Sequence, residues 1–248
     1  MKTYLSFLLG ILLMGCSSSD SGAVENEENR TLAQFIKDRQ IAQSSVIACA
    51  GSTSDASRVR VYLYPRPGVT NIRYFETLNT TIDANNFENY FELQPPIQGL
   101  FNGFLQFFEV VPANEKWVII TFEEAGIVNI SNPIRLKQLT QITEYLPENI
   151  SISNEIGELM PKFDWVDGTF DDSAIYFQVV STEEGDFLSG TYTIERSFQY
   201  YVLDNVVLNI REEEPPTLDL NTNYYFTLLS VTEDNWVNRF SEIQFRLN

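Results

Sequence analysis

Residues 218–231 read Leu218-Asp-Leu-Asn-Thr222-Asn-Tyr224-Tyr-Phe226-Thr-Leu228-Leu-Ser230-Val231. Large apolar side chains alternate along its second half, and a period of two is typical of a β-strand with one buried face. Short runs with the same period recur between clusters of Asn, Gly, Pro and Asp, which favour turns. The sequence therefore predicts an all-β chain of the sandwich type. The recurring alternation is clearest at Val59, Val61 and Leu63, and at Ile175, Phe177 and Val179.

The chain also repeats itself weakly. The segment Trp117–Leu136 resembles the segment Phe226–Leu247, with an offset of 109 residues before a turn and 110 after it. One inserted residue aligns Ser131 with Ser241. Two units of roughly a hundred residues indicate repeated domains and not a solenoid. The boundary is predicted within Gln138–Asn149, which contains a Leu-Pro-Glu turn signal.

The stretch 218–231 resembles the E–F corner and F strand of a fibronectin type III domain. In that family the corner tyrosine, here Tyr224, bonds through its hydroxyl to nearby backbone. Pro161-Lys-Phe163-Asp-Trp165 resembles the B strand with its core tryptophan, and Phe240-Ser241-Glu-Ile243-Gln-Phe245 resembles the G strand. The resemblance implies an E strand after the acidic bend at Glu212–Pro216. In the first unit Glu115 stands where Tyr224 would, so that unit is a degenerate copy.

The amino-terminal residues predict a targeting segment. Lys2 precedes an apolar run of ten residues, Leu5–Met14, which is far shorter than the about 20 residues of a membrane span. Leu13-Met14-Gly15-Cys16 then resembles a bacterial lipobox. The resemblance implies a lipoprotein signal peptide that is removed before Cys16, and acylation of Cys16. Several acyl chains on one cysteine form an effectively permanent membrane anchor.

The residues after Cys16 bear on location. Ser17, and not aspartate, follows the cysteine, and residues 17–29 are polar and acidic. These features resemble lipoproteins of the Bacteroidota that are exported to the cell surface. We expect an outer-membrane protein at the cell surface, with the periplasm-facing leaflet as the alternative.

The expected organisation is thus two tandem immunoglobulin-like or fibronectin III-like β-sandwiches after a signal peptide, a flexible tether and a short helix. A capping-box pattern at Thr31–Gln34 opens the helix. The predicted segments are 1–15 signal peptide, 16–30 acidic tether, 31–43 helix, 44–138 first sandwich and 147–248 second sandwich.

Composition excludes several kinds of function. The chain has 16 Lys and Arg, 34 Asp and Glu and no histidine, for a formal net charge of −18. This charge opposes binding to nucleic acid. Without histidine, Ser-His-Asp and Cys-His catalysis and the common histidine-containing zinc sites are excluded. We expect no enzyme, no cofactor and no catalytic residue. Cys49 is predicted to be a small buried hydrophobe.

Two clusters are candidate binding sites. The first holds aromatic residues, above all Tyr90, Phe91, Phe101 and Phe104, which could stack on sugar rings or simply pack in the core. The second is the run Asp164–Asp172, with four carboxylates that could hold calcium or line a solvated loop. Its spacing does not match an EF-hand, and no metal site is assigned.

The sequence therefore favours a non-catalytic envelope lipoprotein, held at the membrane through Cys16, whose sandwiches bind a glycan, a protein or an outer-membrane partner. A glycosidase that uses two carboxylates and a purely structural spacer are the alternatives.

Overall fold

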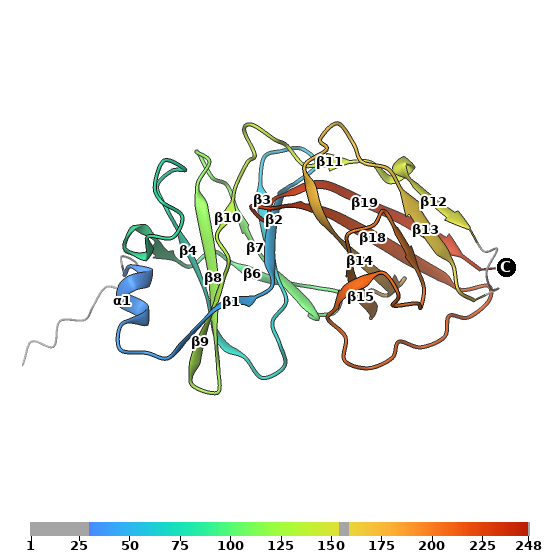
Figure 1. Ribbon diagram of the computed structural model, residues 1–248, viewed down its shortest axis with the longest axis horizontal. Helices are drawn as coiled ribbons and strands as arrows, with labels where there is room; N and C mark the ends of the chain where they lie inside the picture. Colours follow the sequence, from blue (N-terminus) through green and yellow to red (C-terminus); the bar gives the residue numbers. More distant parts are fainter. Residues whose placement is uncertain (1–29, 154–158, 248) are drawn as a thin grey trace, which may run out of the picture.

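The computed structural model describes residues 30–153 and 159–247. Nearly all of the regular structure in this part of the chain is β-sheet, arranged as two sheet pairs that follow each other in sequence (Figure 1). The expected all-β class with two tandem sandwiches is confirmed. No helix among the described residues is long and apolar enough to cross a membrane. The predicted signal peptide, Cys16 and nearly all of the predicted tether lie outside the described residues.

The first sandwich pairs a sheet of order β1-β9-β8-β4-β5, to which β10 adds beside β8, with a sheet of order β2-β3-β7-β6. Their bounds are β1 Ile41–Val46, β2 Ala48–Ser52, β3 Val59–Leu63, β4 Thr70–Glu76, β5 Phe91–Leu93, β6 Ile97–Leu100, β7 Leu105–Val110, β8 Trp117–Glu124, β9 Ile127–Ser131 and β10 Ile134–Arg135. A short 3-10 helix, η2, spans Phe87–Asn89 before β5.

The second sandwich pairs a sheet of order β11-β19-β18-β14-β15-β17 with a sheet of order β12-β13-β16. Their bounds are β11 Glu144–Tyr145, β12 Ile150–Ser153, β13 Lys162–Trp165, β14 Ser173–Thr182, β15 Phe187–Thr193, β16 Ser197–Gln199, β17 Val206–Asn209, β18 Asn223–Thr232 and β19 Val237–Arg246. The 3-10 helix η3 spans Pro147–Asn149.

The first two strands of each sandwich pair in the same way. In the first, β1 pairs in parallel with β9 and the next segment, β2, pairs antiparallel with β3. In the second, β11 pairs in parallel with β19 and β12 pairs antiparallel with β13. Trp117 and Phe226 lie on the equivalent strands β8 and β18, and Ser131 and Ser241 lie on β9 and β19. The weak sequence repeat is thus a repeat of topology.

Residues 218–231 form the corner that their sequence predicts. The hydroxyl of Tyr224 accepts a hydrogen bond of 2.9 Å from the backbone N–H of Asp219. Phe226 stacks on Phe163 with ring centroids 3.8 Å apart, and Trp165 packs beside them in the second core. The predicted B, F and G strands are therefore β13, β18 and β19.

The prediction of an E strand after the bend at 212–216 is wrong. On the side of β13 away from β12, the pairing strand is β16, Ser197–Gln199, and residues 211–222 form no strand. Two consecutive prolines, Pro215 and Pro216, lack the N–H groups that a ladder needs. The hydroxyl of Tyr200 donates to the carbonyl of Pro216 and holds this segment against the sandwich.

The helix is shorter than the predicted 31–43. Helix α1 spans Leu32–Ile36, and the capping box between Thr31 and Gln34 is present. Asp38 adopts a left-handed backbone (φ 59°), and the chain then joins the sheet as β1, so residues 41–43 are strand. Leu32 and Phe35 bury their side chains against the first sheet, and this contact fixes the helix.

Candidate functional site at the junction of the two sandwiches

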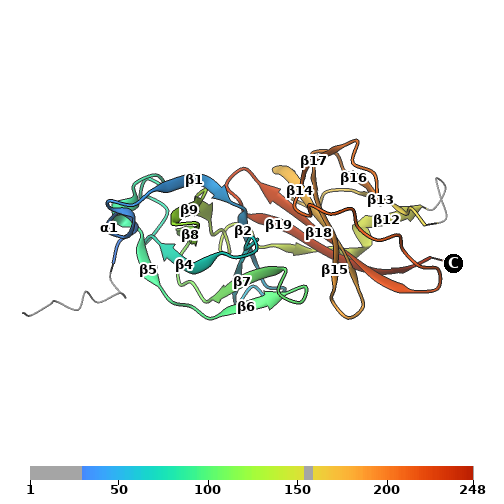
Figure 2. The ribbon, with the colours of Figure 1, turned by 90° about the horizontal axis from the view of Figure 1, so that it is seen from below.

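The two sandwiches meet through the outer faces of two sheets. The sheet with β2, β3, β6 and β7 faces the sheet with β14, β15, β18 and β19 (Figures 1 and 2). The local sequence explains why these two sheets pack together, because several of their strands carry apolar side chains on both faces. In β3, Val59, Val61 and Leu63 fill the first core, whereas Tyr62 packs in the cluster at the junction. In β18, Leu228 fills the second core and Leu229 packs at the junction.

The turn between β18 and β19 enters the first sandwich. Trp236 is fully buried (0% exposed) among the core residues of the first unit, although it belongs to the second. Its indole N–H donates to the carbonyl of Gln141 at 2.7 Å. The backbone N–H of Ala50 donates to the carbonyl of Asn235, and that of Arg135 to Asp234, at 3.0 and 2.9 Å. The first core is therefore completed by a residue of the second sandwich.

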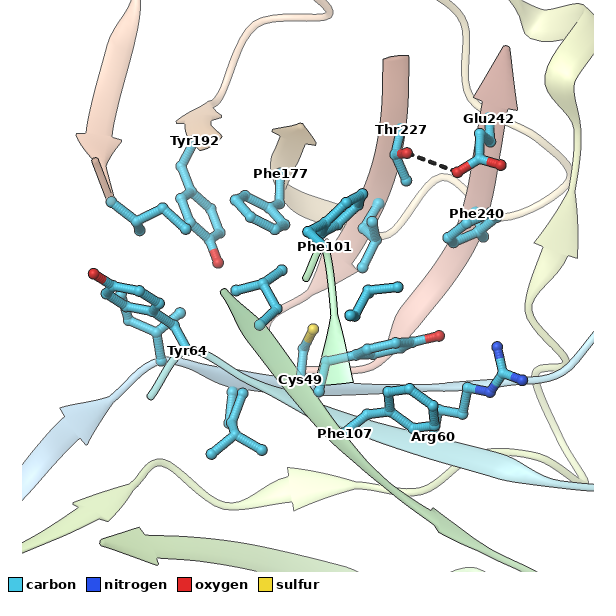
Figure 3. Close-up of a pocket in the computed structure, with 18 residues that line it drawn as sticks. Cys49, Arg60, Tyr64, Phe101, Phe107, Phe177, Tyr192, Thr227, Phe240 and Glu242 are labelled. Atoms are coloured by element: carbon cyan, nitrogen blue, oxygen red, sulfur yellow. Dashed lines mark hydrogen bonds between the residues drawn. The ribbon is translucent and has the colours of Figure 1, made fainter. Parts of the chain in front are cut away.

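A small cavity of about 90 Å³ lies within the junction. Its walls come from both units, as Figure 3 shows, with Cys49 and Phe107 on one side and Phe177, Tyr192 and Phe240 on the other. Near one end Thr227 donates a hydrogen bond of 2.9 Å to Glu242, and at the same end Arg60 bonds to Glu109. The charged groups at this end thus have partners of their own, and the remaining wall is apolar and aromatic.

The pKa values of the ionisable side chains in the cavity wall reflect its low polarity. Burial raises the pKa of the Cys49 thiol to about 12, and burial likewise raises the pKa values of Tyr62 and Tyr192 above the usual range. A thiol with so high a pKa is a poor nucleophile, because the thiolate is the reactive form. The structure therefore agrees with a packing role for Cys49.

An open groove lies beside the junction, where the link between the units passes the second sandwich. Lys137 stands in it, with its ammonium 2.9 Å from Asp234 and 3.1 Å from the side-chain oxygen of Gln141. Asp171 and Asp172 line the same groove. The carboxylates of this groove therefore lie around the Lys137 ammonium, which already pairs with Asp234 and, at 3.8 Å, with Asp172.

The four predicted binding aromatics do not form one surface. Tyr90 is buried in the core under α1, and its hydroxyl donates to the carbonyl of Ala84. Phe91 is 36% exposed on β5. Phe101 and Phe104 lie at the junction, where Phe104 stacks on Phe187 with ring centroids 3.7 Å apart. Core packing accounts for Tyr90, and partial burial at the junction accounts for Phe101 and Phe104, so the structure does not gather the four rings on one surface.

The acidic run at 164–172 is divided among separate partners. Asp164 pairs with Lys162, and Asp172 accepts hydrogen bonds from the amides of Gln141 and Asn238. Burial opposes the ionisation of Asp167, but hydrogen bonds from Arg196 and Tyr176 hold its pKa below the usual value. Within residues 30–153 and 159–247, no group of three or more His, Cys, Asp or Glu side chains could hold a metal ion.

The sequence patterns do not identify Trp236, Phe177 and Tyr192 as members of the junction. Two signals point to Trp236 and Phe177. Trp236 is a large apolar residue in a hairpin turn, where polar residues and glycine dominate. Strand β14 is apolar on both faces around Phe177, and a strand covered on both faces shows a nearly continuous apolar run.

No protein-family model and no curated protein matches this sequence. Among solved structures, a match is the crystal structure of chicken CNTN1 FN1–FN3 domains, with a TM-score of 0.27 and 13% sequence identity. The match covers 84% of this chain and 68% of that chain. The likeness to fibronectin type III domains is therefore distant.

Proposed function

We propose that this protein is a non-catalytic envelope lipoprotein that presents two β-sandwiches, held in fixed relation, as a binding module. The observation that carries the proposal is the junction: an apolar interface with Trp236 inserted across it fixes one sandwich against the other. Surfaces that both sandwiches contribute can then contact one partner without an entropic cost of ordering them.

The amino-terminal sequence supports the same role. The run Leu13-Met14-Gly15-Cys16 is followed by polar, acidic residues up to Arg30, where the described fold begins. A lipid on Cys16 would hold the sandwich pair close to a membrane while the polar segment separates the two. The proposed location is the outer membrane, at the cell surface, with a glycan or an outer-membrane protein as the partner.

Metabolic labelling with a palmitate analogue tests the anchor. The wild-type chain should incorporate label, and Cys16→Ala should abolish it. Cys49→Ala is the matched control, because Cys49 is the one other cysteine in the chain, and this variant should keep full labelling. An unlabelled wild type, or a labelled Cys16→Ala variant, would overturn the anchor.

Protease treatment of intact cells tests the leaflet. Cell-surface display predicts that the sandwich pair is degraded in whole cells, whereas a protein in the periplasm-facing leaflet is degraded only after the outer membrane is opened. A periplasmic marker protein that stays intact in the same samples is the control. Protection in whole cells would move the protein to the inner leaflet.

A glycan array with the chain from residue 30 onward tests binding. Retention of a defined glycan without release of shortened products supports a binding module. Release of reducing ends from that glycan would instead indicate the glycosidase alternative. Absence of binding, together with absence of a stable complex with a neighbouring outer-membrane protein, would leave the spacer and overturn the proposal.

A further inference from the structure

The turn between β6 and β7 contains an asparagine that is followed directly by a glycine, Asn102 and Gly103. It is the one Asn-Gly pair in the chain. Both residues are exposed and have a left-handed backbone, with φ of 51° for Asn102 and 88° for Gly103. Such φ values are typical of tight turns between antiparallel strands. The turn therefore presents an amide side chain beside a residue that has no side chain of its own.

The side chain of Asn102 reaches the second sandwich. Its nitrogen donates to the carboxylate of Asp186 at 2.7 Å and to the carbonyl of Glu184 at 3.5 Å, in the turn between β14 and β15. Next to it, the ring of Phe101 lies 6.1 Å from that of Phe187. The polar contact thus lies at the exposed rim of the apolar junction. It depends on the amide hydrogen atoms of Asn102, which a carboxylate lacks.

The Asn-Gly pair permits a reaction within the chain. The backbone nitrogen of Gly103, once it has lost its proton, can attack the side-chain carbonyl carbon of Asn102. The new C–N bond closes a five-membered imide, and the amide nitrogen of Asn102 leaves as ammonia. Water then opens the imide to aspartate or to its isomer, in which the backbone runs through the side-chain carbon. The net change consumes one water and releases one ammonia, and glycine favours it because no Cβ hinders the attack.

We propose that Asn102 is a self-modification site, at which loss of ammonia converts the amide to a carboxylate and weakens the junction. The new carboxylate faces the carboxylate of Asp186 in place of a hydrogen-bond donor. Like charges in such close contact disfavour the joined arrangement. The site is independent of the lipid anchor and of any surface ligand, so its failure leaves the proposed function untouched.

Two hydrogen bonds restrain the reacting groups while the sandwiches are joined. The N–H of Gly103 donates to the carbonyl of Leu100 at 3.1 Å, and Asp186 holds the amide of Asn102. The amide bond to a charged acceptor is the stronger kind. Deprotonation and attack require both groups to leave these partners. The reaction is therefore slow in the joined protein and faster when the junction opens, and each modified molecule then opens more readily.

Mass spectrometry of the full-length protein, incubated at neutral and at mildly alkaline pH, tests the reaction. The peptide with Asn102 should lose ammonia and gain water, faster at the higher pH. Asp186→Ala frees the amide and should speed the loss several-fold. Glu184→Ala is the matched control, because only the backbone carbonyl of Glu184 contacts Asn102, and it should keep the wild-type rate. An intact Asn102 after alkaline incubation, or equal rates in the two variants, would overturn the proposal.

The variant Asn102→Asp carries the product carboxylate from the start and tests the effect on the junction. It should lower the Tm, and added salt should restore part of the loss, because salt screens exposed charges. Asn71→Asp is the control, since Asn71 is also exposed and left-handed (φ 52°) but lies on β4 and precedes Ile72. Its Tm should change much less, and Asn71 itself should stay intact on incubation. Equal shifts in Tm, or none, would contradict a weakened junction.

Discussion

At the residue scale, Tyr224 is a single side chain that fixes a corner of the second sandwich. Its hydroxyl accepts the N–H of Asp219 at 2.9 Å while its ring packs against Phe245. Tyr224→Phe keeps the ring and removes the acceptor, so we expect a loss of about 1 kcal/mol in the free energy of unfolding. Urea denaturation measures it.

The neighbouring tyrosine is the matched control. The hydroxyl of Tyr225 reaches only Gln244, at 3.5 Å on the exposed side of the sheet. Tyr225→Phe should therefore change the free energy of unfolding by less than about 0.5 kcal/mol. If both variants lost the same amount, the corner bond would have no special role.

Asp55 shows how a turn can set a pKa without burial. The Thr53 hydroxyl donates to its carboxylate at 2.6 Å, and the backbone N–H and hydroxyl of Ser57 add bonds of 3.0 and 2.8 Å. These donors lower the pKa of Asp55 to about 2. Because the folded pKa is depressed, the turn is stabilised above the unfolded value, near 3.9, and that stabilisation is lost as the pH falls through about 2.

An NMR titration of the Asp55 carboxyl carbon measures this pKa directly. Thr53→Val preserves the shape of residue 53 and removes the largest cause of the shift, so the midpoint should move up towards the ordinary value of about 3.9. A wild-type midpoint already near 3.9, or no upward movement in the variant, would contradict the role of these hydrogen bonds.

At the scale of elements, local signals predict the strands that carry them. The corner sequence at 218–231 specifies β18, because its alternation and its tyrosine are encoded in neighbouring residues. Strand β16 has three residues and no room for a pattern, so only its pairing with β13 defines it. Likewise, residues 41–46 carry no local pattern that predicts the parallel pairing of β1 with β9. This pairing makes residues 41–43 strand, so the helix ends earlier than predicted.

Helix α1 is fixed by a charged cluster. The carboxylate of Glu92 is 1% exposed and pairs with Arg30 at 2.8 Å and with Arg73. The guanidinium groups of Arg30 and Arg73 also lie 4.8 and 5.0 Å from the ring of Phe35 on the helix. This cluster connects the start of the fold to β4 and β5.

Glu92→Gln should therefore destabilise the protein by about 2–3 kcal/mol, because two partly buried guanidinium groups lose their counter-charge. Glu123→Gln is the matched control, since Glu123 pairs with Arg39 nearer the surface, and it should cost less than about 1 kcal/mol. Thermal or urea unfolding measures both. Equal losses would indicate that burial of Glu92 contributes nothing.

The hairpin of β18 and β19 carries Trp236 into the first core. Trp236→Ala should cost about 3–5 kcal/mol, the usual range for removing a buried aromatic side chain. Hydrogen exchange should locate the damage in the first unit, at the amides of β2 and β3, and not only in the second unit that contains the residue. Trp236→Phe, which fills part of the space, should lose less. Exchange that increases only in the second unit would contradict the insertion.

At the scale of the whole molecule, the sheets follow one another as four layers (Figure 1), with the junction as an inner apolar layer. The sequence predicts two sandwiches but not this stacking, because residues such as Leu105 and Phe177 come together only through the tertiary arrangement. The density of aromatic residues around Phe101 and Phe104 is a local sequence feature of that layer, since both rings contact Phe187 of the second unit.

The junction predicts that both sandwiches unfold together. A first unit without Trp236 has an incomplete core, and a second unit alone exposes Phe177, Val179 and Leu229 to water, so neither is stable when the other opens. Scanning calorimetry should give one transition with a van't Hoff enthalpy equal to the calorimetric enthalpy. Phe177→Asp, which places a charge in the junction, should split it into two transitions, whereas Val207→Asp on exposed β17 should leave one. Two transitions in the wild type would mean that the apolar layer does not couple the units.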